Sequence, residues 1–302
     1  MITPAPIKPG DKIRIVSPAG KLKAERVMPA VNWLLGKGYR VELGKHIFSS
    51  HFQFSGSNDQ RLQDLQEALN DPETSAIICA RGGYGTVRII DSLDFTEFKK
   101  HPKWLVGYSD ITILHLALNK LEIASIHGTM PPFFFDKNGD ENENLNSLME
   151  QITGEEKIYK FEPEAKQRKG NASGELIGGN LSIITSLLGT KYEINTEGKI
   201  LFIEDIDEYL YHIDRMMYQL KFAGKLEKLA GLVVGDFTDI KDNQQSFGQT
   251  VEEIIWSAVE EYDFPLSFGL KAGHGDLNLA LSFGTKCELH VSNDTSTLKF
   301  KH

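Results

Sequence analysis

The chain has 302 residues, of which 40% are hydrophobic and 25% are charged, close to the average for soluble globular proteins. Its 42 acidic and 33 basic side chains give a formal net charge of −9. This balance argues against a nucleic-acid partner, because such proteins carry a basic surface and no Lys/Arg cluster with interleaved aromatic residues is found here. The length is sufficient for two domains of ordinary size.

The sequence also gives no sign of disulfide cross-links, membrane segments or a bound metal. Two cysteines, Cys79 and Cys287, are too few for a disulfide framework. The N-terminal residues lack the apolar core of a signal peptide, and no apolar run approaches the roughly 20 residues that span a bilayer. No H-E-x-x-H motif or Cys/His cluster indicates zinc. We therefore expect a soluble, cytoplasmic protein with no membrane association, no metal and no cofactor.

The first half of the chain alternates short apolar runs with amphipathic stretches, a pattern typical of parallel βαβ units. Apolar runs predict strands over residues 12–16, 39–43, 76–80, 104–106 and 123–126. Apolar stripes predict helices after residue 27, over residues 59–69, in a short stretch after residue 86, and over residues 110–121.

A change in composition divides the chain. Residues 136–172 are polar and charged, with one short helix expected near 145–152. We predict an α/β domain over residues 1–150, a linker over 151–172 and a second domain over 173–302. In the second half, the patterns predict helices over 181–188, 211–222 and 251–259, strands over 199–203 and 230–234, and a hairpin of residues 287–291 and 297–300.

Polar residues follow three of these strands, at the edge where open α/β sheets place their ligands. The sharpest case is Gly107-Tyr108-Ser109-Asp110, where a strand meets a helix through a glycine and a serine. This arrangement is typical of a nucleophile elbow, although Ile111 stands where a second glycine is usual. Alternatively, Ser109 or Asp110 caps the next helix.

A serine nucleophile requires a base, and two histidines lie beside glycines: His127 and His274. Either could instead bind a buried carbonyl group. Glu204 and Asp205 follow an apolar run, and a buried acid needs a partner, either a histidine or a basic side chain in a structural ion pair. The order Ser109, Glu204, His274 is nucleophile, acid and base, as in hydrolases with triads at a sheet edge.

The loop Arg81-Gly82-Gly83-Tyr84-Gly85-Thr86 lacks both the G-K-[ST] ending of a phosphate loop and the G-x-G-x-x-G spacing of a dinucleotide site. Its backbone N–H groups could stabilise an oxyanion beside the elbow.

Seven motifs in order resemble the LD-carboxypeptidase family of serine peptidases over essentially the whole chain. They are Ile15-Val16-Ser17-Pro18-Ala19, Ala80-Arg81-Gly82-Gly83-Tyr84-Gly85, Gly107-Tyr108-Ser109-Asp110, Gly178-Gly179-Asn180-Leu181, Phe202-Ile203-Glu204-Asp205, Ile213-Asp214-Arg215-Met216 and Gly273-His274-Gly275.

The resemblance implies a flavodoxin- or Rossmann-like N-terminal domain, a smaller β-rich α/β C-terminal domain and a homodimer. It implies a Ser109–Glu204–His274 triad and an oxyanion hole formed by the backbone N–H groups of Asp110 and Gly83. The implied reaction removes the terminal D-Ala from cytoplasmic muropeptide tetrapeptides at an L,D bond, without a metal.

Substrate contacts are less determined by the motifs. Arg81 and Tyr84 are candidates for binding substrate, with Arg81 as the cation for a terminal carboxylate; Arg81 could equally form a structural ion pair. One alternative is an immunity-type peptidase that cleaves aminoacyl or peptidyl nucleotide antibiotics, although no long insertion lies between Glu204 and His274. A second alternative is a non-catalytic binding protein on the same scaffold.

Overall fold

The computed structural model describes residues 1–162 and 166–300. The chain forms two compact units, one of Met1–Glu155 with Leu279–Ser282 and the other of Glu156–Asn278 with the residues from Phe283 onward. The segment predicted as a linker, 151–172, differs from that expectation because it contains a strand of the second unit and the start of another. Residues 279–282, which we expected in the second domain, return to the first unit.

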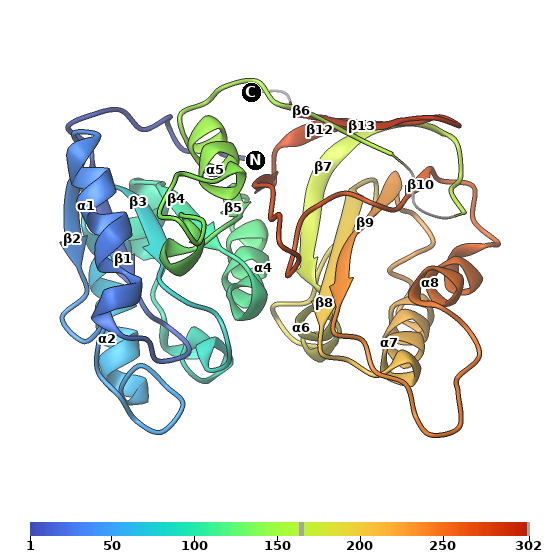
Figure 1. Ribbon diagram of the computed structural model, residues 1–302, viewed down its shortest axis with the longest axis horizontal. Coiled ribbons are helices and arrows are strands. Elements are labelled where there is room, and N and C mark those ends of the chain that lie inside the picture. The colour runs from blue at the N-terminus through green and yellow to red at the C-terminus, as the bar shows by residue number, and fades with distance from the viewer. Residues whose placement is uncertain (163–165, 301–302) are drawn as a thin grey trace. The chain divides into compact units, whose positions relative to one another are not determined.

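A mostly parallel sheet forms the centre of the first unit (Figure 1). Its strands follow the order β2-β1-β3-β4-β5, with β11 added beside β5. The pairs from β2 to β5 are all parallel. This is the flavodoxin-type strand order, so the predicted fold class is confirmed. The strands are β1 (Lys12–Val16), β2 (Arg40–Leu43), β3 (Thr74–Cys79), β4 (Trp104–Gly107), β5 (Ser125–His127) and β11 (Leu281–Phe283).

The helices of the first unit cover the sheet because its strands are apolar on both faces. Ile13, Ile78 and Val106 point to one face, where the core includes apolar residues of α1 and α5. Ile77 and Leu105 are also fully buried, and they alternate to the opposite face. Helix α2 packs against β1 and β3. The helices are α1 (Met28–Gly36), α2 (Asn58–Asn70), α3 (Thr96–Lys100), α4 (Thr112–Lys120) and α5 (Glu143–Ile152).

The second unit contains a mixed sheet with the order β10-β9-β8-β7-β12-β13-β6. The four strands from β10 to β7 are parallel, and the pairs from β7 to β6 are antiparallel. The expected hairpin is present as β12 and β13. The elements are β6 (Ile158–Phe161), β7 (Gly170–Asn180), β8 (Ile200–Ile206), β9 (Gly231–Thr238), β10 (Leu266–Ser267), β12 (Lys286–Val291), β13 (Ser296–Phe300), α6 (Leu181–Ser186), α7 (Leu210–Phe222) and α8 (Val251–Val259).

The sequence patterns missed strand β7, which has glycine at positions 170, 174, 178 and 179. Its glycines allow close strand packing, since a Cβ atom at Gly178 would lie 1.8 Å from the carbonyl oxygen of Phe202. The short helix expected after residue 86 is instead two 3-10 turns, η2 (Thr86–Arg88) and η3 (Ile90–Ser92).

Each unit places polar loops at the carboxyl ends of its parallel strands. In the first unit these loops follow β1, β3, β4 and β5, and in the second they follow β7, β8 and β9. Among residues 1–162 and 166–300, no helix combines the length and the apolar character that a membrane span requires.

Candidate active site

Ser109 lies in a tight turn between β4 and α4 in the first unit. Its φ of +64° is unusual for a residue with a side chain, and such strained backbone is found where a loop must aim a functional group. Helix α4 begins after Ile111, and that position makes no side-chain cap. The capping explanation for Ser109 is therefore wrong for this helix, and the turn has the backbone form of a nucleophile elbow.

The glycine-rich loop after β3 approaches this serine closely. A Cβ atom at Gly82 would lie 2.9 Å from Cβ and 3.2 Å from Oγ of Ser109. Only glycine allows this approach without a shift of one of the two loops. Gly83, predicted as an oxyanion donor, is the next residue. Its N–H group therefore comes directly after the point where Gly82 approaches Ser109. The sequence predicted that this glycine loop lies beside the serine turn, but it did not single out Gly82 as the point of closest approach.

Asp110 ties the serine turn to the glycine loop. Its side chain is buried, and Oδ2 accepts a hydrogen bond of 2.8 Å from the backbone N–H of Thr86. Burial raises the pKa of the Asp110 carboxyl group, an effect opposed by this hydrogen bond and by the positive charge of Arg61. The side chain of Asp110 therefore acts as a brace, and its backbone N–H is the group that we predicted for the oxyanion.

Arg61, on α2, forms hydrogen bonds with the loops after β1 and β3. The sequence patterns did not identify this residue. The side chain is 1% exposed. Its Nη1 atom donates to the carbonyl oxygens of Pro18, in the loop after β1, and of Gly85, in the loop after β3. A guanidinium group can make both bonds because its donors diverge in one plane. The signal for this role was an arginine on the otherwise apolar side of an amphipathic helix.

The histidines near the serine turn are structural. Nε2 of His115 donates to the carbonyl oxygen of Gly107 at 2.9 Å, and Nδ1 lies 2.8 Å from Ser125 Oγ. Burial lowers the pKa of His115 to about 4, so the ring is neutral at pH 7. His127 is fully buried within β5, with its ring centroid 6.0 Å from that of Tyr108. Both histidines therefore pack against residues of the serine turn, His115 against Gly107 and His127 against Tyr108.

In the second unit, Glu204 and His274 form a hydrogen-bonded pair. Glu204 is fully buried on β8, and its Oε2 atom lies 2.6 Å from Nδ1 of His274. Gly273 permits this contact, because a Cβ atom there would lie 2.8 Å from Oε2 of Glu204. Burial alone lowers the pKa of His274, but the charge of Glu204 and the hydrogen bond outweigh it, and the pKa is raised above 6.5.

Asp205 lies beside this pair and shares its electrostatic field. Its carboxylate accepts hydrogen bonds from Asn180 Nδ2 at 2.8 Å and from the backbone N–H of Ser182 at 2.9 Å. Burial and the neighbouring charge of Glu204 raise the pKa of Asp205 to about 7. The two neighbouring acids therefore have different contacts, since Glu204, the acid chosen from the sequence, contacts His274 and Asp205 anchors the start of α6.

The two predicted substrate contacts lie on the exposed side of the glycine loop. The guanidinium of Arg81 donates from Nη1 to the carbonyl oxygen of Lys21 at 2.6 Å. Among the described residues Arg81 forms no ion pair, which removes the structural ion pair considered for it. Tyr84 is 48% exposed, with its ring 6.1 Å from that of Phe54.

The predicted residues fall into two groups. Ser109, Asp110, Gly83 and the neighbouring loop belong to the first unit, and Glu204 and His274 belong to the second. Chemically, the first group offers a serine hydroxyl with backbone donors beside it, and the second offers a base oriented by a carboxylate. These are the parts of a serine hydrolase.

Two family models match this chain. The LD-carboxypeptidase N-terminal domain matches residues 13–128, and the LD-carboxypeptidase C-terminal domain matches residues 173–289. Both predicted site groups lie within the matched residues.

Individual proteins give a consistent result. The "Probable murein peptide carboxypeptidase" of Bacillus subtilis is 36% identical over 98% of this chain and 94% of its own length. The crystal structure of muramoyltetrapeptide carboxypeptidase from Oxalobacter formigenes is 29% identical, with a TM-score of 0.87 over 96% of this chain and 99% of that one. The microcin C7 self immunity protein MccF, in complex with aspartyl sulfamoyl adenosine, has a TM-score of 0.86 at 21% identity and covers 100% of this chain and 99% of its own. At that identity, the last similarity shows the fold alone.

Proposed function

This chain belongs to the LD-carboxypeptidase family and is a serine-type carboxypeptidase, and from that premise we propose that it removes the terminal D-Ala from muropeptide tetrapeptides at an L,D bond. The names of its relatives from Bacillus subtilis and Oxalobacter formigenes, which refer to murein peptides and to muramoyltetrapeptide, support this substrate. The observation that carries the proposal is the 2.6 Å contact between His274 and the fully buried Glu204.

In the proposed reaction, Ser109 is the nucleophile and His274 is the general base. Nε2 of His274 takes the hydroxyl proton as Oγ of Ser109 attacks the carbonyl carbon before D-Ala. The new C–O bond forms, the C–N bond breaks, and His274 returns the proton to the leaving amino group. Water then hydrolyses the acyl-enzyme, again with His274 as the base. Glu204 accepts from Nδ1–H and stabilises the imidazolium without taking the proton.

The oxyanion of each tetrahedral intermediate requires donors that are already in position. We assign these to the backbone N–H groups of Asp110 and Gly83, each worth about 3–4 kcal/mol in comparable sites. The brace between Asp110 and Thr86 supports this assignment, because it holds the serine turn and the glycine loop at a fixed separation.

The proposal extends to the setting of the reaction. We place the enzyme in the cytoplasm, as a homodimer that recycles murein peptides, since these properties accompany the family resemblance. Analytical ultracentrifugation measures the oligomeric state directly, and a monomer at micromolar concentration would contradict the dimer.

A direct test is release of D-Ala from a muropeptide tetrapeptide, followed by mass spectrometry of the tripeptide product. We expect turnover by the wild type and none by Ser109→Ala or His274→Ala. The matched control is His212→Ala, because His212 Nδ1 forms the same kind of contact, 2.8 Å from Glu208 Oε2, in a half-buried position of the second unit. We expect the control to keep wild-type activity.

The same assay separates the alternative substrates. An aminoacyl sulfamoyl adenylate, offered in parallel, represents the substrates of immunity-type peptidases. Cleavage of this compound alone would replace the muropeptide with a nucleotide antibiotic. Cleavage of neither compound, with a melting temperature that Ser109→Ala leaves unchanged, would favour a binding protein on this scaffold.

A further inference from the structure

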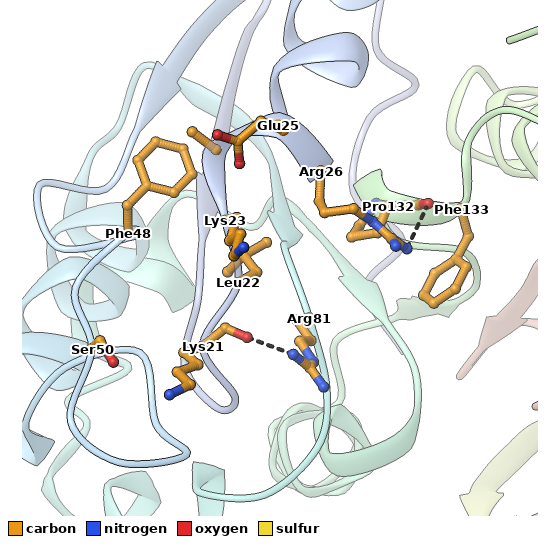
Figure 2. Close-up of a pocket in the computed structure, with 11 residues that line it drawn as sticks. Lys21, Leu22, Lys23, Glu25, Arg26, Phe48, Ser50, Arg81, Pro132 and Phe133 are labelled. Atoms are coloured by element: carbon orange, nitrogen blue, oxygen red, sulfur yellow. Dashed lines mark hydrogen bonds between the residues drawn. The ribbon is translucent and has the colours of Figure 1, made fainter.

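A cavity of about 840 Å³ lies in the first unit at the carboxyl edge of its sheet (Figure 2). Its walls come from the segments that follow β1, β2, β3 and β5. Open α/β sheets bind their ligands at this edge, because the loops there converge. The cavity is large enough for several amino-acid residues, since ligand sites for small molecules commonly have volumes of about 300–1,000 Å³.

The cavity is strongly cationic although the protein is acidic. Lys21, Lys23, Arg26 and Arg81 line it, against the single acid Glu25. The protein as a whole has nine more acidic than basic side chains, as the formal charge of −9 states. Within the part of the chain that the structure describes, none of these four cations forms an ion pair with a carboxylate. A cluster of uncompensated positive charges in a hollow attracts and orients anions.

Both arginines are held by neutral groups, which position them without cancelling their charge. Figure 2 shows Nη1 of Arg81 on the carbonyl oxygen of Lys21, at 2.6 Å, and Nη2 of Arg26 on that of Pro132, at 3.4 Å. The guanidinium of Arg26 also lies 5.8 Å from the ring centroid of Phe133. A guanidinium fixed in this way keeps donors for a carboxylate, with which it can form two parallel bonds.

Apolar side chains complete the cavity. Phe48 is 40% exposed and Phe133 is 44% exposed, and both lie in its walls. Exposed aromatic residues beside cations suit a ligand that has an organic body as well as negative charges. Inorganic ions would use only the cationic part of this surface.

Two backbone contacts connect the wall of the cavity to the turn of the proposed nucleophile. The N–H of Gly20, next to Lys21, donates to the carbonyl oxygen of Gly82 at 3.0 Å. Gly82 follows Arg81 and approaches Ser109, as described above. The cavity and the serine turn therefore lie on neighbouring loops of the same unit.

We propose that this cavity is a subsite for the acidic body of the peptide substrate, in which Arg26, Arg81, Lys21 and Lys23 bind its carboxylates and Phe48 and Phe133 contact its aliphatic parts. The inference rests on the proposed function, since it assigns part of the same substrate. An acidic peptide substrate can offer carboxylates on the acyl side of the scissile bond or at its terminal D-Ala. Both sources share the chemistry of the site, and the experiment distinguishes them.

The test compares three tetrapeptides: the free acid, a form whose acyl-side carboxylates are amides, and a form whose terminal carboxylate is an amide. KM is measured for the wild type and for Arg26→Gln, and affinity is measured by calorimetry in the Ser109→Ala background. We expect Arg26→Gln to weaken binding of the free acid about tenfold, the value of one charge-assisted hydrogen bond. Arg26→Gln should not weaken binding of the peptide with acyl-side amides. It should still weaken binding of the peptide with a terminal amide.

Arg40→Gln is the matched control, because Arg40 is also exposed and donates to a backbone carbonyl group, that of Gly10 at 3.0 Å. It should change none of the three affinities. A penalty that disappears only with the terminal amide would move the site to the leaving group. An equal effect of Arg26→Gln on all three peptides, or no effect, would overturn the subsite while turnover still supports the proposed function. Absence of cleavage by the wild type contradicts the proposed function alone, since calorimetry reads the subsite independently.

Discussion

Nδ1 of His274 lies 2.6 Å from Oε2 of Glu204, with the histidine side chain 12% exposed and the glutamate fully buried. A carboxylate oxygen only accepts hydrogen bonds, so Nδ1 of His274 is the donor in this contact. The contact fixes the histidine tautomer with the proton on Nδ1. This leaves Nε2 as the atom that accepts a proton in the proposed reaction.

Replacing Glu204 with glutamine tests this orientation. Glu204→Gln keeps the size of the side chain but removes the charge that stabilises the imidazolium. We expect kcat to fall about 10³- to 10⁴-fold, as when the acid of a comparable triad becomes an amide. Steady-state kinetics on the tetrapeptide measure the loss. Glu208→Gln, at the half-buried contact with His212, is the control, and an equal loss there would contradict a specific role for Glu204.

The pH dependence of kcat/KM should follow His274. A general base must be unprotonated, so activity rises with pH, and the midpoint of the acid limb should lie above 6.5 because the pKa of His274 is raised. The charge of Asp205 also raises the pKa of His274. Asp205→Asn should therefore move the midpoint to lower pH. A midpoint that stays in place, in a variant that melts normally, would show that Asp205 does not act on His274.

The close approach of Gly82 to Ser109 predicts a large effect of one methyl group. Gly82→Ala places Cβ 2.9 Å from Cβ of Ser109, so one of the two loops must move. A displacement of about 1 Å at a reacting group can reduce the rate about a hundredfold, and we expect that loss in kcat. Gly36→Ala is the control, because nothing lies within 4 Å of a Cβ atom there. Retention of full activity by Gly82→Ala would show that the contact is not part of the catalytic geometry.

Replacing Arg61 should lower the stability of the protein. Arg61→Lys keeps the positive charge but cannot reach the carbonyl oxygens of Pro18 and Gly85 with the same planar donors. We expect the free energy of unfolding to fall by about 2–4 kcal/mol, as when buried polar groups lose their partners. Urea denaturation measures this change, with Arg40→Lys as the exposed control. An unchanged midpoint would mean that the loops are held by other contacts.

The sequence predicted the apolar strands of the first unit because burial on both faces leaves continuous apolar runs, as in β3 and β4. It did not predict β7, in which glycine is required because β8 packs so closely against the strand. That requirement comes from tertiary packing and leaves no apolar run to detect. The two short strands β10 and β11 have too few residues to show a period.

The site shows the same division. The sequence pointed to Ser109, Glu204 and His274 because each follows or interrupts a recognisable local pattern. Arg61 and Gly82 act through atoms of distant segments. Lys21, Lys23 and Arg26 lie together in the loop after β1, but Arg81, Phe48 and Phe133 join them only when the loops after β2, β3 and β5 converge on the same edge of the sheet. Such convergence is set by the order of strands in the sheet. A sequence read along the chain does not contain it.

The central claim is that Ser109 is a nucleophile that His274 activates. The most direct measurement is the reaction of the protein with a tetrapeptide analogue whose scissile carbonyl is replaced by a fluorophosphonate, with the adduct located by peptide mass spectrometry. We expect one adduct, on Ser109, formed at least about a hundredfold more slowly in His274→Ala and at the wild-type rate in His212→Ala. An adduct on another residue, or an unchanged rate in His274→Ala, would contradict it.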